Sequence, residues 1–379
     1  MKSKYLFYFC DGVGSVFDSQ VLALLNAISE KKIFEKILLF LSIKNEKQRE
    51  EIRERKINAE IEIVTFKSYP NYPFFNFLIR KNLQKVIGNT NINLEEVIFH
   101  TRGEMIAWHL KRVLDNKYLR NIFPDIRGAS VEEITEFYDL NKILKSLKIY
   151  SNKKAAKNLK NFKKIYAVSE SLKKYLTNNY DINSEKVAVI PSLASNNFRF
   201  DEQKRRKLRY ELNLNSKDLM VVFSSGGTAN WQNNDIIKIL ADKGLKVLNL
   251  SKKAIRHKNI INKFITYFEM PMYLNSADAA IIWRDKSIVN SVASPVKFSE
   301  YICCGLPVIA NRSVDMISEL ITHEKCGVLL DDIEEVNLNI LDDLRQKDRT
   351  KISELGISKF GIDIIANKYI QSYLSMENL

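Results

Sequence analysis

The chain has 379 residues, of which 45% are hydrophobic and 27% charged, with only 12 glycines and 7 prolines. This composition excludes a disordered or low-complexity protein, and the length exceeds what one hydrophobic core usually supports, so two globular domains are expected. No apolar run is long enough to span a bilayer, and the N-terminal stretch MKSKYLFYFC is interrupted too soon by Asp11 and Gly12 for a signal peptide. We therefore expect a cytoplasmic protein whose four cysteines stay reduced.

The chain is strongly basic, with 59 lysines and arginines against 45 acids and a net charge of +14. Such a charge favours anionic partners, among them nucleic acid, anionic lipid and sugar nucleotides. The densest basic segment, Asn141 to Lys164, holds nine lysines and no acid, and its apolar residues recur with helical spacing. Two interpretations stay open for it: a solvated helix face, or peripheral contact with the inner face of an anionic membrane.

Apolar runs of strand length alternate with helical segments along the whole chain, which predicts an α/β fold with mainly parallel, doubly wound sheets. The expected strands are residues 5–9, 37–41, 61–66, 97–100, 121–123, 165–168, 187–190, 219–223, 246–250, 279–283, 306–309 and 327–330. A first helix is expected at about residues 18–29 and a last one at about 357–374.

An irregular and then strongly charged stretch at residues 191–203 separates two such alternations. It predicts two Rossmann-like domains, residues 1–195 and 196–356, that face each other across a cleft. Residues 357–379 form a C-terminal helix, for which packing against the first domain is one option.

Glycines and arginines follow three strands of the first half. Gly12 and Gly14 are too few and wrongly spaced for a dinucleotide fingerprint, and they indicate either an acceptor contact or a plain tight turn. His100-Thr101-Arg102-Gly103 and Asp125-Ile126-Arg127-Gly128 each place a fixed cation on a loop whose backbone allows close approach of a ligand. A surface ion pair explains either arginine alone, but two such loops together favour a binding site.

In the second half, the strand at 219–223 is followed by Ser225, Gly226 and Gly227. Such small residues let backbone N–H groups approach phosphate or sugar, although the Gly-Lys-Ser/Thr ending of a P-loop is absent.

The most informative stretch runs from Ala277 to Ala310 and reads as strand, loop, helix, glycine and strand. Ser294 is expected to cap the helix and Pro295 to open it. Helical spacing then brings Lys297 and Glu300 within about one turn of each other. A loop at the carboxyl end of a strand, followed by a helix N-terminus, favours a phosphate-bearing ligand.

The segment SPVKFSEYICCGLPVIA, Ser294 to Ala310, resembles the donor-site signature of GT-B glycosyltransferases, specifically of the glycosyltransferase family 4 type. The DIRG segment with the Glu-Glu that follows it, and the SQVLALL segment after the first strand, are similar to those of a family 4 branch found in bacterial surface-polysaccharide enzymes. The resemblance implies that Glu300 binds the ribose hydroxyls of a nucleotide sugar and that the turn from Ser294 to Lys297 faces its diphosphate. Arg284 is similar to an arginine that follows the preceding strand in that branch. The resemblance also implies a retaining reaction in cell-surface polysaccharide synthesis, with a glycan or lipid-linked acceptor in the first domain.

Two departures from the family pattern stand out. Val292 occupies the position of a glutamate that usually touches the donor sugar, and the usual Arg and Lys after the first strand of the second domain are absent. Arg284 and Lys297 are then expected to stabilise the leaving diphosphate. No Asp-x-Asp sequence occurs, and we expect neither a metal nor any cofactor besides the co-substrate.

In this interpretation Gly12, Arg102, Arg127 and Glu133 bind the acceptor. Either Asp125 or Glu133 orients the acceptor hydroxyl, or a phosphate oxygen of the leaving group takes its proton. For His100, contact with the substrate and a purely structural role are equal alternatives.

Two other functions compete with the glycosyltransferase. A non-hydrolysing sugar-nucleotide epimerase, or another GT-B enzyme, has the same donor requirements. A basic nucleic-acid-binding protein would have the charge, but the sequence contains no recognised module for it, and no nucleic acid is expected as a partner.

Overall fold

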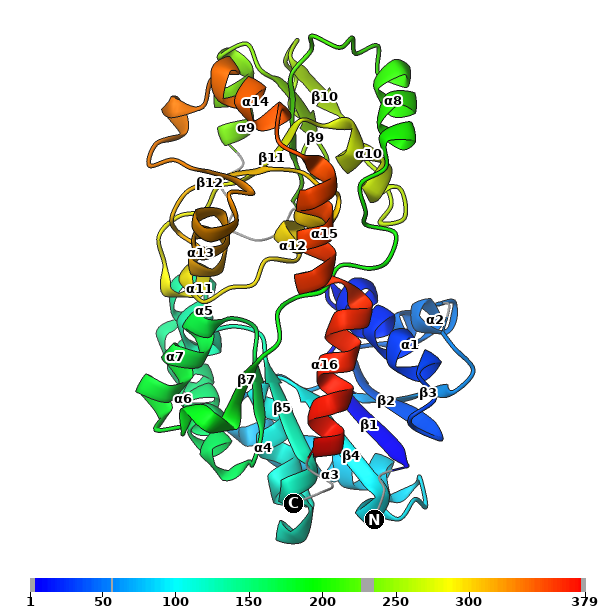
Figure 1. The fold of residues 1–379 in the computed structure, drawn as a ribbon. Helices are drawn as coiled ribbons and strands as arrows, with labels where there is room; N and C mark the ends of the chain where they lie inside the picture. The colour runs from blue at the N-terminus through cyan, green and yellow to red at the C-terminus, as the bar shows by residue number, and fades with distance from the viewer. Residues whose placement is uncertain (1–3, 56, 226–234, 376–379) are drawn as a thin grey trace. The chain divides into compact units, whose positions relative to one another are not determined.

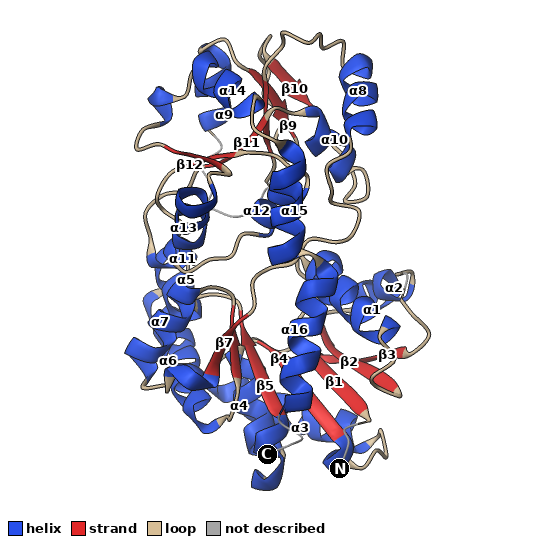
Figure 2. Cartoon of the chain, viewed as in Figure 1, coloured by secondary structure: helices blue, strands red, loops and turns tan. Residues whose placement is uncertain are grey.

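The computed structural model describes residues 4–55, 57–225 and 235–375. The chain forms two compact units, of which the first comprises Met1–Pro191 with Ile365–Leu379 and the second comprises Ser192–Ile364. Each unit is built on one parallel sheet with helices packed against it, as the colouring by secondary structure shows (Figure 1, Figure 2). The chain therefore returns to the first unit after completing the second.

The first unit contains a seven-stranded sheet in the order β3-β2-β1-β4-β5-β6-β7. Its strands are β1 (Tyr5–Cys10), β2 (Lys36–Ile43), β3 (Ile61–Lys67), β4 (Val97–Arg102), β5 (Ile122–Ile126), β6 (Ile165–Ala167) and β7 (Val187–Val189). The order reverses between the neighbours β1 and β4, whose last residues Cys10 and Arg102 pair in register. In a doubly wound sheet, ligands bind beyond the carboxyl ends of the strands at such a reversal.

The second unit contains a six-stranded sheet in the order β10-β9-β8-β11-β12-β13. Its strands are β8 (Met220–Phe223), β9 (Lys246–Asn249), β10 (Ile260–Asn262), β11 (Ala279–Ile282), β12 (Val308–Ala310) and β13 (Gly327–Leu329). Here the order reverses between β8 and β11, which pair in parallel. Residues 224–225 and 283–284 directly follow the strands that meet at this reversal.

Helices connect the strands and cover the sheets. In the first unit they are α1 (Ala23–Glu30), α2 (Glu46–Arg53), α3 (Asn76–Gly88), α4 (Glu104–Val113), α5 (Ser130–Phe137), α6 (Lys142–Asn158) and α7 (Glu170–Tyr180). In the second they are α8 (Glu202–Glu211), α9 (Ile236–Asp242), α10 (Met270–Ser276), α11 (Ile288–Ser291), α12 (Val296–Cys303), α13 (Asp315–Glu324), α14 (Leu338–Arg345) and α15 (Arg349–Phe360). None of the described helices is both long and apolar enough to cross a membrane.

Two glycines allow α12 to pack tightly in the second unit. Gly305, which follows α12, has φ +69°, and a Cβ added to Gly356 of α15 would lie 2.6 Å from the backbone nitrogen of Cys303. Larger residues at either position would strain the backbone or force the helices apart. The helix that carries Lys297 and Glu300 is thus closely packed against α15.

The predicted α/β class with two doubly wound sheets is confirmed, and every predicted strand overlaps an observed one. The boundaries of β5 were wrong, because this strand continues through Pro124 and Asp125 to Ile126. The strand β10 was missed, since Ile260–Asn262 is too short for a recognisable apolar run.

Both predicted terminal helices differ from the observed ones. The first begins as a π-helical segment, Asp18–Leu22, before α1. The expected last helix is divided at Gly361 into α15 and α16 (Ile362–Ser375). Gly361 pairs with Ala194, whose N–H donates to the carbonyl of Phe360 and whose carbonyl accepts from the N–H of Ile362. From Ile365 onward α16 belongs to the first unit.

Candidate functional site

The residues predicted to bind the donor in the second unit directly follow β8 and β11 or lie on α12 and its approach. Tyr301 of α12 accepts a hydrogen bond from the backbone N–H of Ser224 at 3.0 Å, and its hydroxyl lies 2.8 Å from Ser224 Oγ. This contact fixes α12 to the end of β8. Ser225 follows and is buried, whereas Gly226 and Gly227, which were predicted to bind the donor, lie outside the described residues.

Arg284 is a buried cation in this region. It lies just after β11 with 8% of its surface exposed, and its Nη1 donates to Asn290 Oδ1 at 3.2 Å. Its Nε has no partner within the described part of the chain. Burial lowers the pKa of Arg284 to about 10. A buried guanidinium with an amide partner and an unused donor is arranged to receive an anion.

Lys297 and Glu300 lie one turn apart on α12, as predicted. Lys297 Nζ is 2.9 Å from Glu300 Oε2, and the Glu300 side chain is only 1% exposed. A buried carboxylate with one lysine partner retains unused acceptor capacity on its oxygens. The pair therefore combines a cation with an acceptor for hydroxyl groups.

The predicted helix cap at Ser294 was wrong. Pro295 was expected to open α12 but occupies the N-cap position without a side-chain capping bond, and the helix begins at Val296. Ser294 Oγ instead accepts a hydrogen bond from the backbone N–H of Ser192 at 3.0 Å. Ser192 Oγ donates in turn to the Ser294 carbonyl at 2.7 Å. Ser294 thus anchors the start of the second unit to the approach of α12, a long-range contact that local sequence spacing does not reveal.

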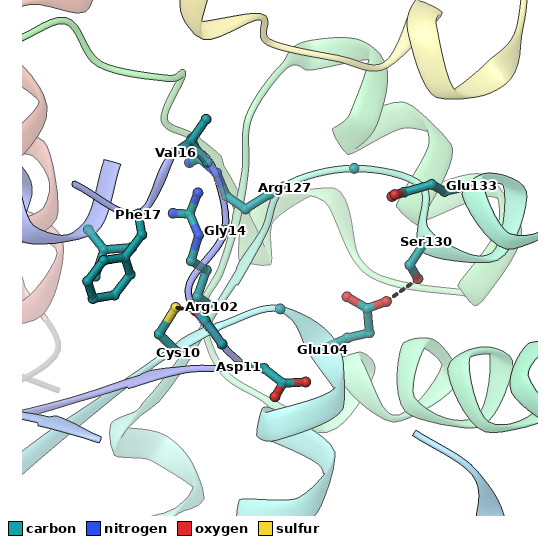
Figure 3. A pocket seen from close by; sticks show the side chains of 14 residues that line it. Cys10, Asp11, Gly14, Val16, Phe17, Arg102, Glu104, Arg127, Ser130 and Glu133 are labelled. Carbon is teal, nitrogen blue, oxygen red and sulfur yellow. Dashed lines mark hydrogen bonds between the residues drawn. The ribbon is translucent and has the colours of Figure 1, made fainter. Parts of the chain in front are cut away.

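In the first unit, a pocket of about 340 Å³ opens at the reversal between β1 and β4 (Figure 3). All four residues predicted to bind the acceptor line it. The complete lining is Cys10, Asp11, Gly12, Gly14, Val16, Phe17, Val21, Arg102, Gly103, Glu104, Arg127, Gly128, Ser130 and Glu133. The three loops that were identified separately in the sequence thus form one site.

The two arginines and two glutamates of this pocket come from different elements. Figure 3 shows the side chains of Arg102 and Arg127 directed toward the segment that carries Gly14 and Val16, with the side chains of Glu104 and Glu133 elsewhere on the pocket wall. Gly12, with φ +87°, shapes the loop after β1 in a conformation that glycine adopts readily. The pocket therefore offers both cations and carboxyl groups to a ligand.

Glu104 is a site residue that the sequence analysis missed. It lies in the first turn of α4, is 7% exposed and accepts a hydrogen bond from Ser130 Oγ. Burial raises the pKa of Glu104, and burial together with the charge of Glu104 raises the pKa of Glu133. The available signal was its position directly after the Arg102-Gly103 turn, where a strand leads into a helix.

His100 on β4 and Asp125 on β5 are both fully buried and are not among the residues that line the pocket. Asp125 accepts hydrogen bonds from Tyr369 Oη at 3.2 Å and from Arg127 Nη1 at 3.4 Å. Although burial alone would raise the pKa of Asp125, the charge of Arg127 and contact with His100 hold it well below its usual range. Asp125 thus remains an anion whose contacts are internal.

His100 hydrogen-bonds through Nδ1 to Tyr373 Oη at 2.8 Å, while its Nε2 is 3.6 Å from Asp125 Oδ2, too far for a good hydrogen bond. Burial lowers the pKa of His100, so the ring is neutral. These contacts favour the structural alternative for His100. The catalytic roles proposed for His100 and Asp125 stay predictions.

Within the described residues, no three His, Cys, Asp or Glu side chains gather in a way that could hold a metal ion. The four cysteines are buried and unpaired. The expectation of a metal-independent reaction stays a prediction.

A family model provides one comparison with known proteins. Residues 281–376 match the family described as glucosyltransferase 3-like, C-terminal domain. The matched range contains Arg284, Lys297 and Glu300. No curated protein sequence matches the chain.

Solved structures provide the second comparison. A glycosyltransferase from Rickettsia africae is 16% identical with a TM-score of 0.69, and the alignment covers 100% of this chain and 99% of that one. HepE of Anabaena, in complex with UDP and glucose, is 12% identical with a TM-score of 0.67 and coverage of 98% and 100%. WaaG, a glycosyltransferase involved in lipopolysaccharide biosynthesis, is 11% identical with a TM-score of 0.66 and coverage of 96% and 98%.

The two comparisons agree with the architecture described above. Both sheets and their helices correspond to the GT-B fold along the length of the chain. The chain has the GT-B fold, which confirms the predicted fold, and its residues 281–376 match the glucosyltransferase 3-like C-terminal domain.

Proposed function

We propose that the protein transfers a sugar from a nucleotide-sugar donor to a glycan or lipid-linked acceptor in cell-surface polysaccharide synthesis. The observation that carries this proposal is Arg284, a buried arginine beside the reversal of the second sheet whose Nε has no hydrogen-bond partner among the described residues. Burying a guanidinium without a carboxylate is costly, so an anionic ligand explains its position best. HepE, which shares the fold, is solved with UDP-glucose, and this makes UDP-glucose the first donor to test.

The roles of the donor residues follow from their chemistry. Arg284 and Lys297 stabilise the diphosphate as the bond between the sugar C1 and the phosphate oxygen breaks. Glu300 accepts hydrogen bonds from the ribose hydroxyls, and Ser294, Pro295 and Ser225 border the site. The acceptor oxygen forms the new bond to C1, and its proton passes to a phosphate oxygen of the leaving nucleotide. The charges and atoms therefore balance without a metal.

A donor panel tests the proposal directly. Wild-type protein is mixed with UDP-, GDP-, CMP- or dTDP-sugars, and the melting temperature is measured, because a ligand that binds only the folded state raises stability. One nucleotide class is expected to raise it and the others not. The absence of any shift, together with salt-dependent binding of DNA or RNA, would support the nucleic-acid alternative instead.

Product analysis separates transfer from epimerisation. With the selected donor and a lipid or glycan acceptor extract, the free nucleotide and a glycosylated product should appear together, the anomeric configuration of the donor should be retained, and EDTA should leave the rate unchanged. Conversion of the donor sugar without an acceptor would establish the epimerase. An inverted linkage or EDTA sensitivity would refute the retaining or metal-independent part of the proposal.

Peripheral contact with a membrane through Asn141 to Lys164 is part of the same proposal. On α6, Ile143 and Tyr150 are 75% and 56% exposed among lysines, and the neighbouring 3₁₀ turn at Pro73–Phe75 exposes Phe74. Exposed apolar groups among cations suit an anionic lipid surface. Sedimentation with vesicles containing anionic lipid should retain the wild type and release a variant with Lys142, Lys145 and Lys153 replaced by glutamine. Equal retention of both would refute this contact.

A further inference from the structure

The pocket of the first unit combines charges in a way that the proposed acceptor role does not by itself require. Arg102 and Arg127 both line it, and both follow strands at the carboxyl edge of the sheet. Arg102 is half-buried, and Asp125, which contacts Arg127 at 3.4 Å, is also the carboxylate whose charge helps to raise the pKa of Arg102. One carboxylate shared between two guanidinium groups offsets only part of their positive charge.

Glu104 and Glu133 require hydrogen-bond donors from a ligand, whereas the arginines require an anion. Both pKa values are raised, chiefly by burial, and neither Arg102 nor Arg127 is among the groups whose charge shifts them. The pocket thus presents two guanidinium groups and two carboxyl groups with raised pKa values to the same ligand. A ligand that satisfies both sets must present an anionic group to the guanidinium groups and hydroxyl groups to the carboxyl groups.

We infer that the acceptor is a sugar bearing a phosphoryl group, with the phosphoryl oxygens bound by Arg102 and Arg127 and the sugar hydroxyls facing Glu104 and Glu133. Planar guanidinium groups match phosphate oxygens in a bidentate manner, and two of them are suited to one phosphoryl group. The pocket volume of about 340 Å³ is at the small end for ligand sites, which suits a single sugar with its phosphate. A phosphoryl link to a lipid would meet the same requirement. This inference rests on the proposed transfer function, because it identifies the acceptor of that reaction.

The test measures binding in the absence of donor. The dissociation constants of a panel of hexose 1-phosphates, the matching methyl hexosides, the hexuronic acids and inorganic phosphate are measured by calorimetry on the full-length protein. At least one hexose 1-phosphate should bind about tenfold or more tightly than its methyl hexoside, the difference expected for a charged hydrogen-bonded contact. Arg102→Gln should abolish this preference, and Arg120→Gln, which removes an exposed arginine of the same unit, should preserve it.

The other outcomes each overturn the inference. Equal binding of phosphorylated and neutral sugars would show that the guanidinium groups do not bind the acceptor anion. Inorganic phosphate binding as tightly as every sugar phosphate would indicate an anion site without sugar recognition, and preference for a hexuronic acid would indicate a carboxylate ligand. Weaker binding of UDP to Arg102→Gln would assign the arginines to the donor.

The result is distinguishable from failure of the proposed function. If no nucleotide sugar stabilises the protein, the transfer function fails even when the sugar phosphate binds. If the donor binds and transfer occurs but no hexose 1-phosphate is preferred over its methyl hexoside, the transfer function stands and only the acceptor assignment is wrong.

Discussion

The reversal points of the two sheets, β1/β4 in the first unit and β8/β11 in the second, differ in how their arginines are compensated. In the first unit, Asp125 contacts Arg127 and accepts a hydrogen bond from Tyr369. In the second unit, Arg284 has an amide partner, Asn290, and its Nε has no partner in the part of the chain that the structure describes. The buried carboxylate of Glu300 on α12 is paired with Lys297 and not with Arg284.

This difference shows how one sheet topology supports two kinds of site. Where the protein supplies a countercharge, as Asp125 does for Arg127, the arginine is already stabilised in the empty site. Where the countercharge must come from the ligand, as at Arg284, the empty site is energetically costly and the ligand relieves that cost. The following predictions test whether this contrast is real.

The largest effect is expected for Arg284→Gln. Loss of one preorganised donor to a developing negative charge typically costs about 10²- to 10³-fold in turnover. Because burial already disfavours the charged form, the melting temperature should be unchanged or higher. Turnover with the selected donor and thermal unfolding check both expectations. Arg206→Gln, which replaces an arginine whose side chain is 80% exposed on α8, is the control.

A lower melting temperature of Arg284→Gln with normal turnover would contradict the proposed difference between the two sites. It would mean that Arg284 serves the fold and that the protein, not a ligand, compensates its charge.

Glu300→Gln should remove discrimination at the ribose. A hydrogen bond to a charged group contributes about 1.5 to 3 kcal/mol, so wild-type protein should bind UDP about 10- to 100-fold more tightly than its 2′-deoxy analogue if the donor is a uridine nucleotide. The variant should bind the two about equally. Calorimetry with both nucleotides provides the measurement, and the exposed Glu319→Gln serves as the control. A preference that survives in Glu300→Gln would rule out the ribose role.

Tyr369→Phe tests the internal compensation in the first unit. The change removes the hydrogen bond to the buried Asp125 carboxylate and should lower the free energy of unfolding by about 1.5 to 3 kcal/mol. Urea denaturation of this variant is compared with that of Tyr210→Phe, in which the altered tyrosine is 85% exposed. Equal stability of the two variants would show that Asp125 does not depend on Tyr369.

The smallest effect is a pH dependence that depends on Glu104. Its pKa is raised in the folded state, so between the ordinary and the raised value the folded protein binds more protons than the unfolded chain, and stability falls as pH rises. Glu104→Gln does not titrate and should gain stability relative to wild type between about pH 4 and pH 7. Urea unfolding at both pH values measures the gain. The exposed Glu136→Gln should show none, and a pH-independent difference for Glu104→Gln would contradict the burial argument.

The sequence was most informative where apolar runs are long and buried. Strands such as β2 and β4 were predicted from such runs, and the residues that follow them were correctly grouped, since parallel strands end at a common edge. Pro124 obscured β5, because proline is unusual in a central strand, and the three residues of β10 give no periodic signal.

Side-chain partners distant in sequence were beyond local reasoning. Ser294 has the sequence context of a cap, yet its hydroxyl binds Ser192, about a hundred positions away. In the sequence, Glu104 resembles any glutamate in the first turn of a helix. Its contact with Ser130 and its electrostatic interaction with Glu133 depend on the fold. The burial of His100 under Tyr373 depends on the last helix, whose packing the sequence left open.

The return of the chain to the first unit has a consequence for biosynthesis. Tyr369 and Tyr373 complete the burial of Asp125 and His100, but they are synthesised after the entire second unit. During translation, Asp125 and His100 in the first sheet therefore lack their tyrosine partners while the second unit is being synthesised. We expect a nascent chain that ends before α16 to remain loosely packed and dependent on chaperones, and the first unit to complete its native core only after α16 has been synthesised.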